Sequence, residues 1–114
     1  EYVNNGLLLE AERQFQLAIA SDPASADAYA GLAQVHEHAG SMKMAQQEAS
    51  KSLEEKPNVA AYLVLARIAL AQRSYAIAQK NVQQALEIDP NNSAAKGILL
   101  AIEARQRDTH QPTR

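Results

Sequence analysis

Small and apolar residues recur along this chain at the spacing of helical turns. Ala11, Phe15 and Ala18 follow one another at spacings of four and three residues, which places them on one face of a helix. Ala, Leu, Gln and Glu, which favour helices, dominate the composition, whereas the β-branched and aromatic residues typical of strands are sparse. The pattern predicts an all-α chain, with helices over residues 7–20, 25–39, 42–55, 59–72, 75–88 and 92–106.

The boundaries of these segments carry residues that begin and end helices. Ser25, Ser41 and Ser74 stand at N-cap positions, where a hydroxyl can accept a backbone N–H. Gly40 follows the helix predicted over residues 25–39, in a position where glycine favours a C-cap. We therefore expect short turns at these points.

Both ends of the chain depart from the repeating pattern. Gly6 is predicted to form a turn between a first helix that includes Tyr2 and the helix that begins at Leu7. Residues 107–114 contain Pro112 and no apolar residue, so we expect a disordered tail there. Because the chain does not begin with Met, we expect it to be an excised or processed segment.

Three copies of one pattern follow each other along the chain. They read Ala11-x3-Phe15-x2-Ala18, Ala45-x3-Ala49-x2-Ser52 and Ala78-x3-Val82-x2-Ala85, and the prolines after them are Pro23, Pro57 and Pro90. The step from Ala45 to Ala78 is one residue shorter than the step from Ala11 to Ala45. The missing residue falls in the turn after Pro57, where a deletion is tolerated. We expect Ala11, Ala45 and Ala78 to be buried at equivalent contacts, because a small side chain lets a neighbouring helix pack closely.

A second group of matching positions precedes the small residues in the later copies. It reads Tyr29-x2-Leu32-Ala33-x2-His36 and Tyr62-x2-Leu65-Ala66-x2-Ala69. A period of about 34 residues with W-x2-L-G-x2-Y, A-x3-F and P is typical of the tetratricopeptide repeat. The chain resembles that family in both the period and the motif. The departures are modest, since Ala replaces the small Gly, His36 and Ala69 replace the late Tyr, and Ala49 and Val82 replace the Phe.

The resemblance implies a right-handed α-solenoid of antiparallel helix pairs. The array is expected over residues 1–106, divided into a truncated repeat 1–23, the repeats 24–57 and 58–90, and a C-terminal capping helix 92–106. In that last helix Lys96 and Glu103 stand where large aromatic residues belong. This polar drift is typical of a terminal repeat, which must present one face to water.

Length and charge limit the possible functions. A chain of 114 residues accommodates one domain with its own core. Its 11 basic and 13 acidic residues are scattered, so no block of one sign indicates nucleic acid or an anionic membrane. The longest apolar run, Val59 to Leu70, contains Arg67 and is too short to cross a bilayer. With no cysteine and no signal peptide at the start of the chain, the sequence leaves the cellular compartment undetermined.

His36-Glu37-His38 is the only stretch that suggests metal binding or catalysis. Residues two apart on a helix point in different directions, whereas zinc-binding histidine pairs are four apart. His36 also falls in the buried aromatic position of the repeat and is expected to pack there. The sequence has no Gly-rich phosphate loop, no G-x-S-x-G motif and no cysteine nucleophile. We therefore expect neither an enzyme nor a bound metal or cofactor.

In tetratricopeptide proteins the first helix of each pair lines a concave face, where a peptide or helix of another protein binds. The resemblance implies such a groove in this chain. The residues expected to contact a partner there are Gln34, Glu37, His38, Leu63, Arg67, Leu70 and Arg105. In an alternative interpretation, Leu63, Val64 and Leu70 pack only against neighbouring helices.

Arg67 is the most distinctive of these residues, because it is a charge within an apolar helix. No acidic residue lies three or four positions from it, so the guanidinium needs solvent or an acceptor elsewhere. That acceptor is either a group of a partner or Glu37, on the preceding groove helix. Some members of the family bind acidic chaperone tails through a clamp of Lys, Asn and Arg. We do not expect that ligand, because the neighbouring clamp positions hold Ala30, Gly31, Ala60 and Val64.

The competing hypothesis is a structural role as a spacer or self-association segment of a longer repeat protein. Truncation of the first repeat is expected to expose apolar surface around Leu8 and Phe15. Upstream repeats or a second copy of the chain would cover that surface. The sequence does not identify the partner or the pathway.

Overall fold

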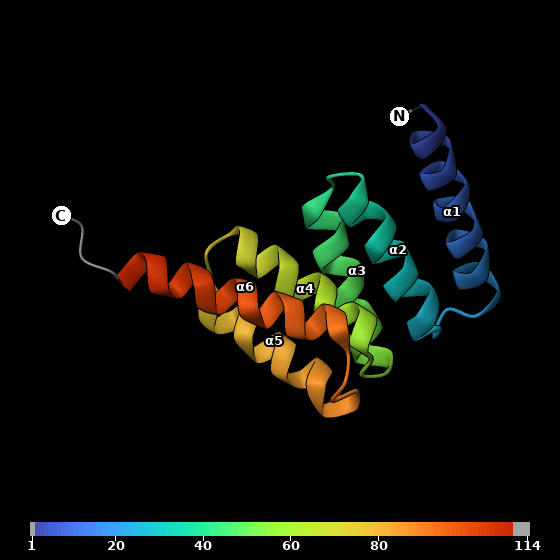
Figure 1. Ribbon diagram of the computed structural model, residues 1–114. Coiled ribbons are helices and arrows are strands. Elements are labelled where there is room, and N and C mark those ends of the chain that lie inside the picture. The colour runs from blue at the N-terminus through green and yellow to red at the C-terminus, as the bar shows by residue number, and fades with distance from the viewer. Residues whose placement is uncertain (1, 111–114) are drawn as a thin grey trace.

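The computed structural model describes residues 2–110 of the 114-residue chain and the side chains of residues 6–108. This part contains helices and no strand. The helices are α1 (Tyr2–Ser21), α2 (Ala26–His38), α3 (Met42–Glu55), α4 (Val59–Ala71), α5 (Tyr75–Ile88) and α6 (Ser93–His110). They form an elongated array that runs from α1 at one end to α6 at the other (Figure 1).

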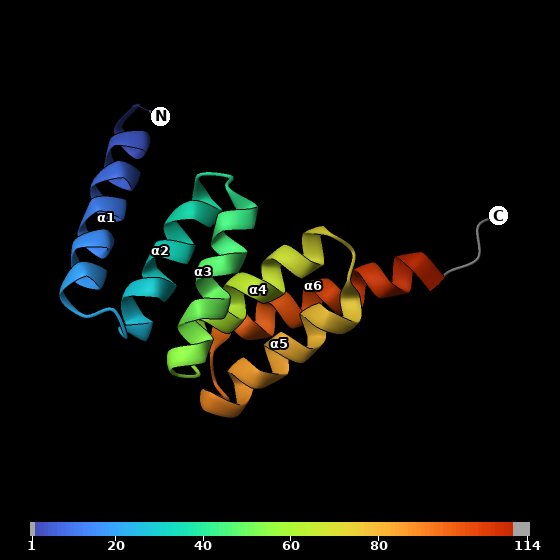
Figure 2. The same ribbon diagram turned by 180° about the vertical axis from the view of Figure 1, so that it is seen from behind.

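Helix pairs stack into two layers. α2 pairs with α3 and α4 pairs with α5, while α2 also packs on α4 and α4 on α6. One face of the array is therefore formed by α2, α4 and α6, and the opposite face by α3 and α5, as the two views show (Figure 1, Figure 2). Among the described elements, α1 packs on α2 alone. The prediction of an all-α solenoid of antiparallel helix pairs is confirmed.

Helix ends follow the predicted boundaries within one residue from α2 to α5. The hydroxyl of Ser25 accepts the backbone N–H of Ala28 at 3.1 Å and caps α2 as expected. Ser41 and Ser74 do occupy the N-cap positions of α3 and α5, but their side chains make no capping hydrogen bond. Gly40 takes a φ of +86° after α2, a left-handed conformation that glycine adopts without steric strain.

Both terminal predictions need correction. α1 continues without interruption through Gly6, so the predicted turn is wrong. A Cβ at Gly6 would meet nothing within 4 Å, so no second helix packs there, and a glycine in an open helix costs only about 1 kcal/mol relative to alanine. At the other end α6 reaches His110, which makes residues 107–110 of the expected tail helical. No Gly or Pro stops the helix before Pro112, and residues 111–114 lie outside the described part.

Buried residues form two clusters. The first joins α2, α3 and α4 through Ala30, Ala33, Ala45, Ala49, Ala61, Val64 and Ile68. The second joins α4, α5 and α6 through Leu63, Ala66, Ala69, Leu70, Ala78, Val82, Ala85, Ala95, Ile98 and Ile102. The many alanines allow close helix approach, so a modest amount of apolar surface excludes water from both clusters.

The repeat alanines are equivalent in two of the three copies. Ala45 and Ala78 are completely buried, as predicted. Ala11 is only half-buried, so the prediction for the first copy is wrong. The cause is that α2 is the only described helix packed on α1. The contact between α1 and α2 is nevertheless close, because a Cβ at Gly31 would overlap the ring of Phe15.

Candidate functional site

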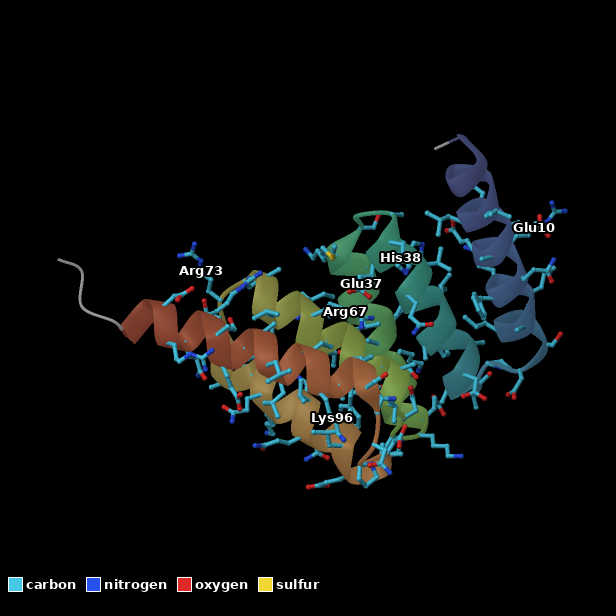
Figure 3. All side chains as sticks on the ribbon, viewed as in Figure 1. Glu10, Glu37, His38, Arg67, Arg73 and Lys96 are labelled. Carbon is cyan, nitrogen blue, oxygen red and sulfur yellow. The ribbon has the colours of Figure 1, made fainter. Side chains whose placement is uncertain are left out.

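Arg67 of α4 and Glu37 of α2 form a bidentate ion pair between neighbouring helices. The guanidinium donates from Nε to Oε2 at 2.7 Å and from Nη2 to Oε1 at 2.9 Å. The side chain of Glu37 is 13% exposed and that of Arg67 is 36% exposed. Figure 3 shows the side chains of Glu37 and Arg67 directed toward each other. Of the two acceptors considered from the sequence, Glu37 is the one that Arg67 has in this structure.

The ion pair borders a small hollow that we call the Arg67 hollow. Its volume is about 110 Å³, and its lining residues are Glu37, Met42, Arg67, Ile68, Ala71 and Gln72. Most of the wall is aliphatic. The carboxylate of Glu37 accepts from Nε and Nη2 of the guanidinium. The Nη1 nitrogen donates to none of the described residues. The guanidinium of Arg67 therefore keeps unused hydrogen-bond donors, and the hollow that Arg67 helps to line has space for an aliphatic side chain.

The remaining residues predicted for the groove do not gather at this point. Gln34 is half-buried and His38 is exposed, both on α2. Leu63 and Leu70 are 6% and 9% exposed and belong to the cluster between α4, α5 and α6, as the packing interpretation holds. Arg105 is exposed on α6 and lines a different hollow, together with Arg73, Tyr75 and Asp108.

His36 makes contacts that sequence reasoning missed. The predicted burial of this residue is correct, since it is 5% exposed. Its Nδ1 lies 2.6 Å from Oε1 of Glu48 on α3, and its Nε2 lies 3.1 Å from Oε2 of Glu12 on α1. Burial alone lowers the pKa of His36, but the hydrogen bonds and charges of Glu48 and Glu12 outweigh it and raise the pKa above its ordinary value of 6.5. Neither carboxylate is near His36 in the sequence, so only the stacking of three helices reveals the group.

The side chains of the His36-Glu37-His38 stretch diverge. His36 faces α1 and α3, Glu37 binds Arg67, and His38 is exposed. In the part of the chain that the structure describes, no three His, Asp or Glu side chains form a group suited to a metal ion. No helix in that part is long and apolar enough to span a membrane.

Both the sequence and the arrangement of the helices are similar to those of known proteins. Residues 1–60 and 63–109 match the sequence profile of the tetratricopeptide repeat. The chain is similar in structure to the repeat domain of Arabidopsis OM64, with a TM-score of 0.81 and 22% identity over 89% of this chain and 84% of that one. It is also similar to the first repeat domain of Spaghetti (RPAP3) bound to the HSP90 peptide SRMEEVD, with a TM-score of 0.80 and 20% identity over 92% and 84%. The first repeat domain of human RPAP3 has a TM-score of 0.80 and 18% identity over 96% and 89%.

Proposed function

Because this chain belongs to the tetratricopeptide repeat family, we propose that it is a protein-interaction scaffold whose face of α2, α4 and α6 binds a peptide or helix of a partner protein. The observation that carries the proposal is Arg67, whose guanidinium keeps unused donors and which lines a largely aliphatic hollow. The Spaghetti domain, which shares the fold, is bound to a peptide, and this supports a polypeptide as the class of ligand.

The ion pair limits the groups that the Arg67 hollow can accept. Glu37 compensates the guanidinium charge, so an incoming carboxylate would be repelled by Glu37 while it is attracted by Arg67. A neutral acceptor, such as a backbone carbonyl or a side-chain amide, can meet the Nη1 donors without that repulsion. The aliphatic wall suits an apolar side chain beside this acceptor. The partner segment is therefore uncharged where it enters the hollow.

An acidic peptide of the kind bound by the Spaghetti domain does not fit these requirements. Three of the seven residues in SRMEEVD are acidic. The neighbouring clamp positions that the family resemblance implies hold Ala30, Gly31, Ala60 and Val64 in this chain. A carboxylate would thus meet one guanidinium that already has a partner, and no second basic group.

The other groove residues have two roles in this proposal. Gln34 and His38 extend the contact surface along α2. Leu63 and Leu70 hold α4 against α5 and α6 and so fix the position of Arg67. Arg105 is contacted only by a partner long enough to continue over α6.

The proposal is tested by capturing partners from the source cell with the wild-type protein and measuring their affinity for variants. Arg67→Ala should weaken binding by about 1–3 kcal/mol, the range for a hydrogen bond to a charged group. Ala71→Phe should weaken it as well, because the exposed Ala71 borders the hollow and a ring there would fill it while leaving the ion pair intact.

Arg13→Ala is the matched control. It also removes one guanidinium, but Arg13 is exposed on α1 and lines neither the Arg67 hollow nor the hollow at Arg105. A partner that binds Arg67→Ala and Ala71→Phe as tightly as wild type would exclude this face as the binding surface.

A second candidate function, self-association, is favoured by the surface of α1. Leu7, Leu9 and Leu17 are between 56% and 66% exposed on this helix. Exposed leucines on one helix can mediate contact with a second copy. Light scattering over a range of concentrations decides the point, because a strict monomer would eliminate this candidate and leave the groove proposal intact.

A further inference from the structure

Glu12, His36 and Glu48 form a group, the histidine triad, that joins three helices. His36 lies on α2 with its side chain 7% exposed, and each of its ring nitrogens is within hydrogen-bond distance of a carboxylate. Glu12 comes from α1 and Glu48 from α3, two helices that do not pack against each other in the described part of the chain. The imidazole is therefore a polar link that spans this end of the array.

The number of protons in the triad follows from its geometry. A carboxylate can only accept hydrogen bonds, whereas a neutral imidazole has one N–H donor and one lone pair. With ionised carboxylates 2.6 Å from Nδ1 and 3.1 Å from Nε2, both contacts are hydrogen bonds only if both ring nitrogens donate. We propose that His36 is held as an imidazolium and that its proton makes the attachment of α1 to the rest of the array dependent on pH.

Loss of the proton would act mainly on α1. Neutral His36 can donate to only one carboxylate, so either Glu12 or Glu48 would face a lone pair. The charged group on α4, Arg67, is occupied by Glu37 and cannot replace the lost charge. Glu48 is 16% exposed and Glu12 is 28% exposed, so Glu12 can turn toward water more easily. Since α1 packs only on α2 among the described helices, it has few other contacts to hold it.

The triad is accessible to proton exchange despite its burial. A hollow of about 310 Å³ lies between α1 and α2, and His36 and Glu12 are among its lining residues. The rest of its wall is Leu8, Leu9, Val35 and Ala39. Water in this hollow can reach the ring, so the protonation state of His36 can follow the pH of the solution without unfolding.

The direction of the effect follows from linkage. The pKa of His36 in the folded chain is raised above 6.5 by its two carboxylates. The stabilisation is therefore complete below 6.5, the ordinary value, and is lost as the pH rises through the higher folded-state value. We expect α1 to be bound more firmly in mildly acidic than in alkaline solution. Each unit of pKa increase corresponds to about a tenfold change in the equilibrium.

The test is NMR of the whole chain between pH 5 and 9, with ring nitrogen shifts for the protonation state of His36 and amide exchange protection factors for α1. In wild type, both ring nitrogens should carry protons at pH 6, and His36 should titrate above its ordinary value of 6.5. The protection of α1 relative to α5 should fall in the same pH range. His38→Ala is the matched control and should leave this profile unchanged.

Two variants keep the test decisive. His36→Gln should give α1 protection that is low and independent of pH. If this variant fails to fold, Glu12→Gln, which changes a partly exposed carboxylate, should lower the pH dependence of α1 in its place. The proposal is overturned by a neutral His36 ring at pH 6, by a proton located on Glu48, or by α1 protection in wild type that does not change with pH.

Discussion

The two repeats in the middle of this chain use one frame of positions with different chemistry. The late aromatic position is His36 in one repeat and Ala69 in the next. In the same frame, Glu48 corresponds to Asn81 and the buried Ser52 to Ala85. The helices α1–α3 thus share ionised and hydroxyl contacts in addition to their small apolar ones, whereas the contacts among α4–α6 are mainly aliphatic.

This difference separates two ways of stabilising the same fold. Aliphatic contacts between α4, α5 and α6 depend on buried area alone and are insensitive to pH. Between α2 and α3, the Ser52 hydroxyl donates to the carbonyl of Ala26 at 2.7 Å, and His36 requires its proton. Buried polar groups contribute less net stability than aliphatic ones of the same size, but they are costly to leave unpaired. The N-terminal half should therefore respond to solution conditions to which the C-terminal half is indifferent.

The largest effect should come from a cavity in the aliphatic half. Ile102 of α6 is completely buried against α4 and α5. Ile102→Ala should lower the free energy of unfolding by about 2–5 kcal/mol, because the surrounding helices cannot collapse fully into the space. The loss, measured by urea denaturation, should be equal at pH 6 and pH 9. A loss of stability that changes with pH would contradict the proposal that the contacts among α4, α5 and α6 are insensitive to pH.

In the polar half, the effect of removing a contact should itself depend on pH. His36→Gln should lower the free energy of unfolding by about 1.5–3 kcal/mol at pH 6, where the imidazolium binds both carboxylates. The pKa of His36 is raised in the folded chain, so its contribution declines as the pH rises through that value, and the difference from wild type should shrink by pH 9. Parallel urea curves of the two proteins at both pH values provide the measurement. An equal difference at both would show that His36 contributes only by packing.

The repeat frame accounts for most of what the sequence predicts correctly. Helices α2 to α5 and the burial of Ala45 and Ala78 follow from the spacing of small and apolar residues. The repeat pattern assigns each residue to a position in the repeat, but it does not give the direction of a long side chain between helices. For that reason the Glu37–Arg67 contact was one of two alternatives, and the partners of His36 were missed altogether. Gly6 shows a further limit, because a glycine permits a turn without requiring one.

Equivalent alanines provide a third comparison, between a complete and an incomplete helix contact. Ala78→Leu should destabilise the chain by about 1–3 kcal/mol, because Ala78 is completely buried and the helix contact has no space for a larger side chain. Ala11→Leu should have a smaller effect, since Ala11 is half-buried. The melting temperatures of both variants, measured by thermal denaturation, give the comparison. Equal shifts in the two melting temperatures would mean that α1 is as tightly packed as α5.

The smallest effect concerns the turns that close the two repeats. Gly40 and Arg73 occupy the same place after α2 and α4, and both have positive φ, at 86° and 64°. An L-residue in this conformation is strained by about 1–2 kcal/mol, and a glycine avoids the strain but loses more chain entropy on folding. Arg73→Gly should therefore raise the stability by a net amount of about 0.5–1 kcal/mol, and Gly40→Arg should lower it by a similar amount. A matched pair of melting curves tests both directions at once. If Arg73→Gly is destabilising, the exposed guanidinium of Arg73 must make a favourable interaction that outweighs the strain of its backbone, and the two turns are not equivalent after all.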